Sequence, residues 1–254
     1  LDQGFVVYDD DVRPPSGDPR GRTVEDQLFY EERKADDVTD VALEWLQGHS
    51  GGPFFAWLHY FDPHMPYHAP EPFSQFFADS PYAAEIAYMD DSLGRVLDWL
   101  RQGGLMDRTV VVVVGDHGEG LGQHRENTHG LTIYNSILKV PLIVRTPGLD
   151  SGRVPSTVQT IDVMPTVCEL VGAPTPAEVQ GSSLVPMLRG GPAFDRDSYF
   201  ETLRGRLQYG WSPVFGLGHG QWKFIESPEP ELYDLAQDPG ETVNLVVRHT
   251  EVAQ

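Results

Sequence analysis

The strongest hydrophobic pattern of the chain is a run of five valines in the segment TVVVVVGDHGEGL, residues 109–121. An uninterrupted run of β-branched residues lacks the alternation of a half-exposed strand. It predicts a strand that is buried on both faces, as in a parallel sheet covered by helices. Asp116 and His117 follow directly where this strand ends. Because ligands of open α/β sheets bind beyond the carboxyl ends of the strands, we expect chemistry at this position.

A second apolar run, FFAWLHY at residues 54–60, predicts another buried strand. Between the two runs, residues 84–102 carry apolar side chains at helical spacing and end at a pair of glycines, which predicts a helix. Strand, helix and strand in this order predict a βαβ unit with parallel strands. The loops after Tyr60 and Val114 are then expected at the same edge of the sheet.

The rest of the pattern predicts further elements of an α/β domain. An amphipathic surface helix is expected over residues 23–47, and a helix that Asp162 caps and Gly172 ends is expected over 162–170. A short helix at 131–138 and a buried strand at 140–145 lie between them.

The pattern changes after the Gly-Gly-Pro break at residues 190–192. Short apolar segments separated by turns predict a small antiparallel subdomain with strands near residues 198–202, 214–219, 222–225 and 231–235. The expected fold class is therefore α/β, with a largely parallel sheet flanked by helices in a domain at residues 1–190. A small antiparallel β subdomain at residues 191–254 follows and ends in the start of a helix.

Composition narrows the classes of function. The 254 residues include 18 Lys or Arg and 38 Asp or Glu, a net charge of −20, which argues against nucleic acid or an anionic membrane surface as a partner. No apolar run approaches the about 20 residues that span a bilayer. The single cysteine, Cys168, excludes an internal disulfide and a cysteine metal cluster. Since the sequence opens on LDQGFVVYDDD, without a methionine, we expect further residues before Leu1 and also after Gln254.

Histidine is concentrated around the two predicted strand ends, with six of the nine histidines within residues 59–129. Asp116 and His117 offer a carboxylate and an imidazole side by side, which suits a divalent cation. His64 lies between two prolines that stiffen the backbone. A histidine held in this way suits anion binding or proton transfer to a leaving group.

A glycine-rich polar loop, EGLGQHRENTHG at residues 119–130, carries His124, Arg125 and His129. Such a loop brings cationic donors to an oxyanion, and the same composition also fits a flexible surface turn. The residues alone leave both readings open.

Taken together, these motifs resemble the sulfatase family of the alkaline-phosphatase-like superfamily, over roughly the C-terminal two-thirds of its length. The matching segments are PFFAWLHYFDPHMPY, AEIAYMDDSLGRVLDWLRQGGLMDRTVVVVVGDHGEGLGQH, THGLTIY with KVPLIVRTPG, TIDVMPTVCELVGAP with QGSSLVPML, and WKFI with ELYDLAQDPGETVNL. Their order matches the family, and such a series is more specific than any single motif.

The resemblance implies roles for particular residues. Asp116 and His117 match metal ligands, and His64 matches the histidine that contacts the sulfate group. His129 falls 13 residues after Asp116, where many sulfatases place a sulfate-binding lysine. His64 and His129 are therefore candidate catalytic residues, and both are also expected to bind substrate. His124 and Arg125 are further candidates for substrate binding. The implied metal is divalent, with calcium expected first and manganese, magnesium or zinc as alternatives.

The family's nucleophile motif, Cys or Ser followed by x-Pro-x-Arg, is absent from the chain, as is its early Asp-Asp metal pair. In the family this Cys or Ser becomes formylglycine, whose hydrate attacks sulfur, so the nucleophile is expected outside this chain. The intact enzyme is expected to be a sulfuric ester hydrolase and this chain alone to be inactive. The resemblance further implies a small-molecule or carbohydrate sulfate ester as substrate and an extracytoplasmic location, periplasmic or secreted. The oligomeric state is left open.

Two alternatives remain beside the sulfatase hypothesis. A phosphoester or phosphonate hydrolase of the same superfamily also uses an Asp-His pair. A non-catalytic binding or structural relative would account for the absent nucleophile motif. A zinc protease is disfavoured, since the chain has no His-Glu-x-x-His motif.

Overall fold

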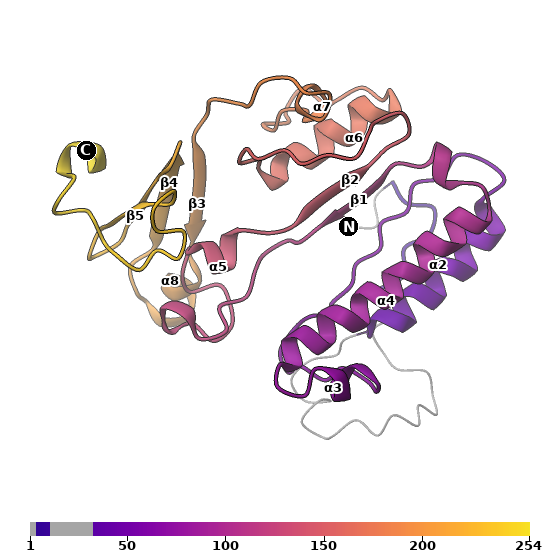
Figure 1. Ribbon diagram of the computed structural model, residues 1–254, viewed down its shortest axis with the longest axis horizontal. Helices are drawn as coiled ribbons and strands as arrows, with labels where there is room; N and C mark the ends of the chain where they lie inside the picture. Colours follow the sequence, from indigo (N-terminus) through magenta and orange to yellow (C-terminus); the bar gives the residue numbers. More distant parts are fainter. Residues whose placement is uncertain (1–3, 11–32) are drawn as a thin grey trace. The chain divides into compact units, whose positions relative to one another are not determined.

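The computed structural model describes residues 4–10 and 33–254, and it divides the chain into two compact units, residues 1–106 and 107–254. Figure 1 shows their elements in the colours of the sequence. The predicted boundary near residue 190, which separates an α/β domain from the C-terminal strands, stays a prediction.

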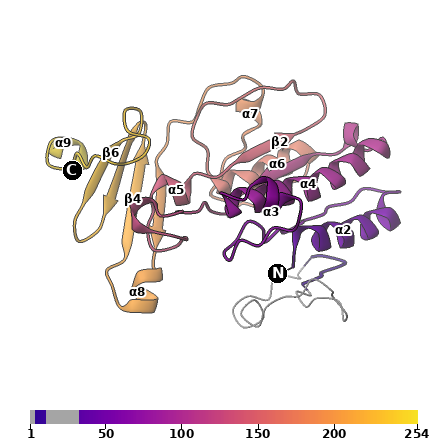
Figure 2. The ribbon, with the colours of Figure 1, turned by 60° about the horizontal axis from the view of Figure 1, so that its bottom comes forward.

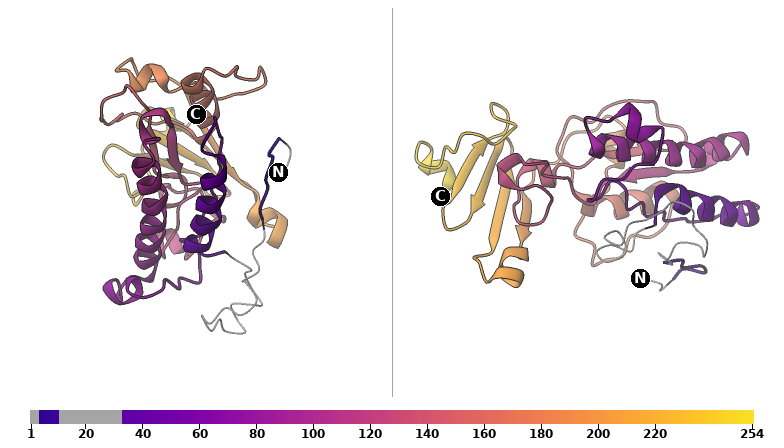
Figure 3. Two further views of the ribbon diagram at one scale, coloured as in Figure 1. Left: turned by 90° about the vertical axis from the view of Figure 1, so that its right-hand side faces the viewer. Right: turned by 90° about the horizontal axis from the view of Figure 1, so that it is seen from below.

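The first unit is built on two long helices, α2 (Ala35–His49) and α4 (Pro81–Gln102), which pack side by side (Figure 3). A short helix, α3 (Phe73–Phe76), lies against α4. The predicted helix over 84–102 is confirmed. Of the predicted helix over 23–47, the structure has the part from Ala35, and residues 23–32 lie outside the described part of the chain.

The contact between α2 and α4 depends on small and polar side chains. Ala35, Thr39, Ala84 and Ser92 are all almost fully buried. The Thr39 hydroxyl donates to the backbone carbonyl of Ser92 at 3.2 Å, so the two helices approach closely. The hydrophobic pattern pointed instead to the larger apolar residues of α4, and it missed this stripe.

The predicted strand at residues 54–60 forms no ladder with another strand in the part of the chain that the structure describes. Phe55 and Trp57 are 64% and 72% exposed. The predicted parallel pairing with the valine strand stays a prediction, because residues 54–60 and the valine strand belong to different compact units. A strand needs a hydrogen-bonding partner, and an apolar run alone does not identify that partner.

The second unit opens with the turn η1 (Met106–Arg108) and the valine strand β1 (Val111–Val114). β1 pairs with β2 (Leu142–Arg145), and the pairing is antiparallel, with Val112 opposite Val144. The predicted strand over 140–145 is thus confirmed, and it is an antiparallel neighbour of β1.

Two helices cover one face of the β1–β2 pair: α6 (Val163–Val171), preceded by η3 (Thr160–Asp162), and α7 (Val185–Leu188). The helix α6 ends at Gly172 in a left-handed conformation, φ 71°, as predicted. Asp162 does not cap it through its side chain. The buried carboxylate instead accepts the backbone N–H groups of Gln159 and Ser182 and pairs with Arg196.

The four predicted C-terminal strands form an antiparallel sheet in the order β3-β4-β5-β6, as Figure 2 shows. Their bounds are β3 (Ser198–Thr202), β4 (Val214–His219), β5 (Trp222–Glu226) and β6 (Glu231–Asp234). The helix α8 (Arg204–Tyr209) connects β3 to β4, and the last residues include α9 (Thr250–Ala253).

The predicted short helix near 131–138 is α5 (Asn135–Leu138), and it is packed on this sheet. Ile133, just before the helix, forms a buried cluster with Ile225 of β5 and Tyr233 of β6, and Leu138 packs against that cluster. The contact matters for the site, because α5 follows the polar loop that begins at the end of β1.

Candidate active site

The segment that carries Asp116 and His117 is held against α5 by backbone hydrogen bonds. The N–H of Gly115 donates to the carbonyl of Pro141 at 3.2 Å, and the N–H of Gly118 donates to that of Ile137 at 2.6 Å. A Cβ added at Gly118 would lie only 2.1 Å from the carbonyl oxygen of Ser136. Only glycine allows this approach, so the sequence Asp-His-Gly fixes the loop where β1 ends.

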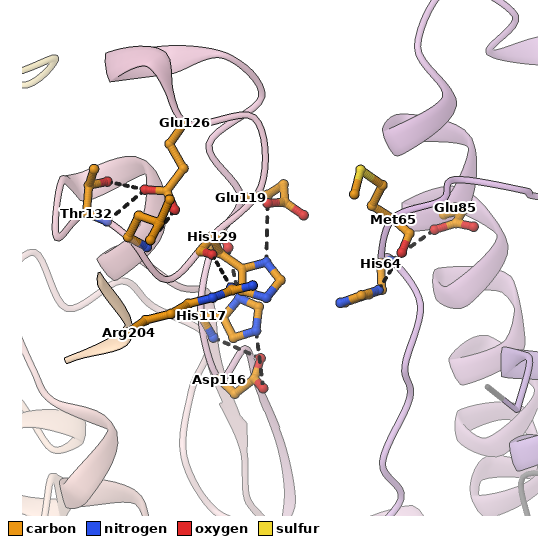
Figure 4. A network of polar contacts seen from close by, with 12 residues as sticks. His64, Met65, Glu85, Asp116, His117, Glu119, Glu126, His129, Thr132 and Arg204 are labelled. Atoms are coloured by element: carbon orange, nitrogen blue, oxygen red, sulfur yellow. Dashed lines mark hydrogen bonds and ion pairs between the residues drawn. The ribbon is translucent and has the colours of Figure 1, made fainter. Parts of the chain in front are cut away.

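The side chains of Asp116 and His117 lie close together where β1 ends (Figure 4). Nδ1 of His117 lies 2.9 Å from the Gly118 carbonyl oxygen, so Nδ1 is assigned the proton and Nε2 keeps the lone pair. Nε2 lies 3.7 Å from Oδ2 of Asp116. Metal–ligand lengths of about 2.0–2.6 Å place two ligands of one ion about 3–4 Å apart, so this pair fits a divalent metal.

Among the residues that the structure describes, no group of three or more His, Cys, Asp or Glu side chains is placed to hold a metal ion. Asp116 and His117 are also well exposed, at 78% and 40% of their side-chain surface. The pair is therefore exposed to solvent, and the described residues provide no third His, Cys, Asp or Glu beside it.

His129 lies next to the metal-capable pair. Its ring centroid is 4.0 Å from that of His117, and the rings are tilted by 31°. Nδ1 of His129 lies 3.4 Å from Oε1 of Glu119, a carboxylate that is only 5% exposed. The structure thus brings together the predicted residues Asp116, His117 and His129, and it adds Glu119, which orients the His129 ring.

The loop between His117 and His129 is tightly built. The buried carboxylate of Glu126 accepts the N–H of Leu131 at 2.7 Å and the N–H of Thr132 at 2.9 Å, and it also accepts the Thr132 hydroxyl. A Cβ at Gly120 would lie 2.3 Å from the carbonyl oxygen of Glu126. This loop is therefore an ordered scaffold for His129, which removes the flexible-turn reading of the sequence.

Two predicted substrate-binding residues lie within this loop in strained conformations. His124 and Arg125 have φ values of 50° and 65°, in the region that favours glycine. The ring of His124 stacks on Tyr134 with centroids 3.6 Å apart, and its Nε2 lies 3.1 Å from the Gly240 carbonyl oxygen. His124 thus connects the loop to the C-terminal part of the unit, whereas Arg125 is exposed.

Arg204, on α8, is a site residue that the sequence analysis missed. Its Nη1 donates to the His129 carbonyl oxygen at 2.7 Å, and Figure 4 shows its guanidinium beside the rings of His117 and His129. A Cβ at Gly130 would lie 2.9 Å from this side chain, so the glycine makes room for it. A local sequence pattern does not indicate a contact between positions that are 75 residues apart in the chain.

His64 belongs to the first unit. Its Nδ1 donates to the Met65 carbonyl oxygen at 2.7 Å, and its ring lies 4.3 Å from that of Phe61. Its backbone N–H donates to Oε2 of Glu85, on α4, at 3.0 Å. The imidazole is thus fixed in direction, as the neighbouring prolines predicted.

Glu85 holds the whole His64 loop. It is fully buried, and it also accepts the N–H of His68 at 2.6 Å. Burial raises the pKa of Glu85 to about 7, against the opposing effect of Lys34, whose Nζ lies 3.6 Å away. The hydrophobic pattern gives no sign of this residue, because helical spacing predicts apolar side chains on the inward face of α4.

The predicted convergence of His64 with Asp116, His117 and His129 stays a prediction, since His64 and the other three belong to different compact units.

Comparison with known families shows to which family the chain belongs. The sulfatase family profile matches residues 5–173, and the profile of the N-sulphoglucosamine sulphohydrolase C-terminal region matches residues 128–254. The chain belongs to the sulfatase family. This confirms the predicted family.

Among curated proteins, this sulfatase chain is 30% identical over 188 residues to arylsulfatase K of Bos taurus, covering 67% of the chain and 34% of that protein. It is 35% identical over 151 residues to a delta 4,5-hexuronate-2-O-sulfatase of Bacteroides thetaiotaomicron, covering 54% of the chain and 30% of that protein. The chain thus spans about a third of the length of these relatives.

Among solved structures, the phosphonate monoester hydrolase of Silicibacter pomeroyi matches 87% of this sulfatase chain and 58% of its own, with a TM-score of 0.73 and 26% identity. The likeness confirms the α/β fold class of the alkaline-phosphatase-like superfamily, and the antiparallel C-terminal sheet is present as predicted.

Membership in the family implies a divalent metal and a formylglycine nucleophile in general terms. The donor set of Asp116 and His117 fits such a metal. As for membranes, none of the described helices combines the length and the apolar character that crossing a bilayer requires.

Proposed function

We propose that this chain forms part of a metal-dependent sulfuric ester hydrolase. The observation that carries the proposal is the cluster at the end of β1, where Nε2 of His117 lies 3.7 Å from Oδ2 of Asp116 and the His129 ring lies 4.0 Å from His117. A pair of metal-binding donors beside a second histidine is suited to holding an oxyanion.

In the proposed site, Asp116 and His117 hold a divalent metal. Calcium is the proposed ion, with manganese, magnesium or zinc as alternatives, because a carboxylate oxygen suits calcium and an imidazole is a ligand for several other metals. When bound, such an ion withdraws charge from the oxygens of a sulfate ester. The formylglycine nucleophile is expected outside this chain.

The remaining residues act on the substrate. His129 and Arg204, joined through the His129 carbonyl, bind the sulfate oxygens, and His124 and Arg125 are proposed as further contacts. His64, with Nδ1 engaged by Met65, binds the sulfate and transfers a proton to the leaving alcohol from its other nitrogen.

An acidic protein with a net charge of −20 can bind an anion at this place. Exposed charges beyond the Debye length of about 8 Å are largely screened at physiological salt. In the proposed site, the metal and Arg204 would contact the sulfate directly, well within that distance. Local charge therefore decides the binding.

A sulfated carbohydrate is the proposed substrate. The relative from Bacteroides thetaiotaomicron is a hexuronate-2-O-sulfatase, and it is 35% identical over the matched region. An extracytoplasmic location, periplasmic or secreted, is proposed with it. We expect no nucleic acid partner, because the net charge is strongly negative.

The test is Asp116→Ala in the full gene product. We expect metal affinity and turnover of an aryl sulfate to fall more than about 100-fold, since losing even an outer partner of a metal ligand costs 10–100-fold. Asp107→Ala is the matched control, because that carboxylate lies in the same unit and is 99% exposed. Unchanged turnover in Asp116→Ala would contradict the proposal.

A phosphoester or phosphonate hydrolase is the second candidate, favoured by the 26% identity to a phosphonate monoester hydrolase over most of the chain. Matched aryl sulfate, phosphate and phosphonate esters separate the two by their kcat/KM values. A sulfate preference supports the sulfatase proposal, and a phosphonate preference supports the alternative. A gene product that binds the metal but hydrolyses none of the three is a non-catalytic relative.

A further inference from the structure

The second unit contains a buried ion pair that has no part in the proposed chemistry. Lys223 on β5 and Glu241, which follows β6, are 1% and 2% exposed. Nζ of Lys223 lies 2.5 Å from Oε1 of Glu241, and Nζ also lies 5.5 Å from the centroid of the Phe200 ring. Two charges are seldom buried so completely without a structural or functional reason.

Both members of the pair also contact Asn135, the first residue of α5. Nζ of Lys223 donates to the side-chain oxygen of Asn135 at 3.2 Å. The backbone N–H of Asn135 donates to Oε2 of Glu241 at 2.5 Å. Glu241 has a φ of 55°, which is unfavourable for a residue other than glycine. Glu241 thus has an unfavourable backbone conformation at the position from which its carboxylate reaches the start of α5.

The helix α5 in turn supports the metal-capable loop. The Gly118 N–H donates to the Ile137 carbonyl at 2.6 Å, and a Cβ added at Gly118 would lie 2.1 Å from the carbonyl oxygen of Ser136. Gly118 directly follows Asp116 and His117, and its own carbonyl oxygen fixes Nδ1 of His117. A continuous series of contacts thus runs from the C-terminal sheet through α5 to the two proposed metal ligands.

We infer that the buried Lys223–Glu241 pair positions the metal ligands Asp116 and His117, by holding the first turn of α5 through Asn135. Lys223 and Glu241 are positioning residues, since neither contacts the proposed ligands. The inference deepens the proposed function and rests on it for the identity of the ligands. It assigns to the C-terminal sheet the task of setting the affinity for the metal.

The decisive step is the hydrogen bond from the Asn135 N–H to Glu241, and two double variants isolate it. Lys223→Met with Glu241→Gln removes both charges but keeps an oxygen that accepts this N–H. Lys223→Met with Glu241→Leu removes the charges and the acceptor, at a similar side-chain size. The two proteins differ only in whether residue 241 offers an acceptor to the backbone N–H of Asn135.

The experiment measures the dissociation constant of calcium by titration calorimetry, on the metal-free full gene product. The Met/Leu form is expected to bind about 10-fold more weakly than the Met/Gln form, the lower end of the effect of outer partners on metal ligands. Equal affinities in the two forms would overturn the inference, and so would a weaker Met/Gln form.

A second readout does not depend on a metal. Hydrogen exchange of the peptide that contains Gly118 should quicken about 10-fold in the Met/Leu form relative to the Met/Gln form, because the Gly118 N–H loses its fixed acceptor on α5. Unchanged exchange would contradict the inference. If the Met/Leu protein does not fold, Lys223→Met with Glu241→Ala replaces it, since water can then satisfy the Asn135 N–H, and a smaller change of about 3-fold is expected.

These results are distinct from failure of the proposed function. A wild-type protein that hydrolyses no sulfate ester would end the sulfatase proposal, whereas the exchange comparison would still decide whether the pair positions the loop. A lower melting temperature in both double variants, with unchanged calcium affinity and unchanged exchange at Gly118, would assign the pair a purely stabilising role and overturn the inference.

Discussion

The loop that carries Asp116 and His117 is held by backbone hydrogen bonds to α5 and to Pro141, whereas the loop that carries His64 is held by the side chain of Glu85. Backbone groups do not titrate, so the hydrogen bonds that hold the first loop directly do not depend on pH. The second loop depends on a buried carboxyl group whose pKa is raised to about 7. The two histidine loops should therefore respond differently to substitution and to pH.

The largest expected effect comes from Gly118→Ala. The added methyl group would lie 2.1 Å from the Ser136 carbonyl oxygen, so the loop must move away from α5. Since a misplacement of about 1 Å can cost about 100-fold in rate, we expect turnover in the full gene product to fall by at least that factor. Gly152→Ala is the control, because a Cβ there meets no atom within 4 Å. An active Gly118→Ala enzyme would show that the loop is not fixed by α5.

A smaller effect is expected at the other loop, from Glu85→Gln measured against pH. The pKa of Glu85 is raised by burial from 4.5 to about 7, so the folded protein holds this proton where the unfolded chain has lost it. The stabilisation by this group is complete below pH 4.5 and is lost as the pH rises to about 7, a change of about 3 kcal/mol at 1.36 kcal/mol per pH unit.

Glutamine does not titrate, so the unfolding free energy of the wild type relative to Glu85→Gln should fall between pH 4.5 and pH 7 and then stay constant. Denaturant unfolding at pH 5 and pH 8 measures the difference. If the difference in unfolding free energy between the wild type and Glu85→Gln does not change with pH, the raised pKa of Glu85 is contradicted. The Asp98→Asn variant, on the exposed face of the same helix, serves as the control for replacing a carboxylate by an amide.

The smallest effect is expected from Arg204→Gln, which removes a cation from the His117 and His129 cluster. A charge-assisted hydrogen bond of about 1.5 kcal/mol corresponds to a rise in KM of about 10-fold, with a smaller change in kcat. Arg206→Gln, an exposed residue of the same helix, is the control. Equal KM values for the two variants would remove Arg204 from the substrate site.

The sequence predicted most elements of this chain, but it did not identify every pair of neighbouring strands. The helix α4 and the four C-terminal strands follow from local spacing and turn residues, and they lie where expected. The antiparallel pairing of β1 with β2 was not predicted, because an apolar run fits a parallel or an antiparallel neighbour equally well. Hydrophobic pattern specifies burial, and hydrogen-bonding partners are decided over longer distances.

Local sequence patterns likewise identified only part of the candidate site. Asp116, His117 and His129 were found from one polar loop after one strand, and the structure brings them together. Arg204 and Glu241 lie far along the chain, and no local motif connects them to that loop. Glu85 was not predicted for another reason. A buried acidic residue interrupts the apolar pattern by which the inward face of a helix is identified.

The most direct test of the account is the position of the metal. Crystals of the full gene product grown with manganese allow the ion to be located by its anomalous scattering. The account predicts a peak within about 2.0–2.6 Å of both Oδ2 of Asp116 and Nε2 of His117. An ion bound elsewhere, with these two side chains left in hydrogen bonds to water, would contradict it.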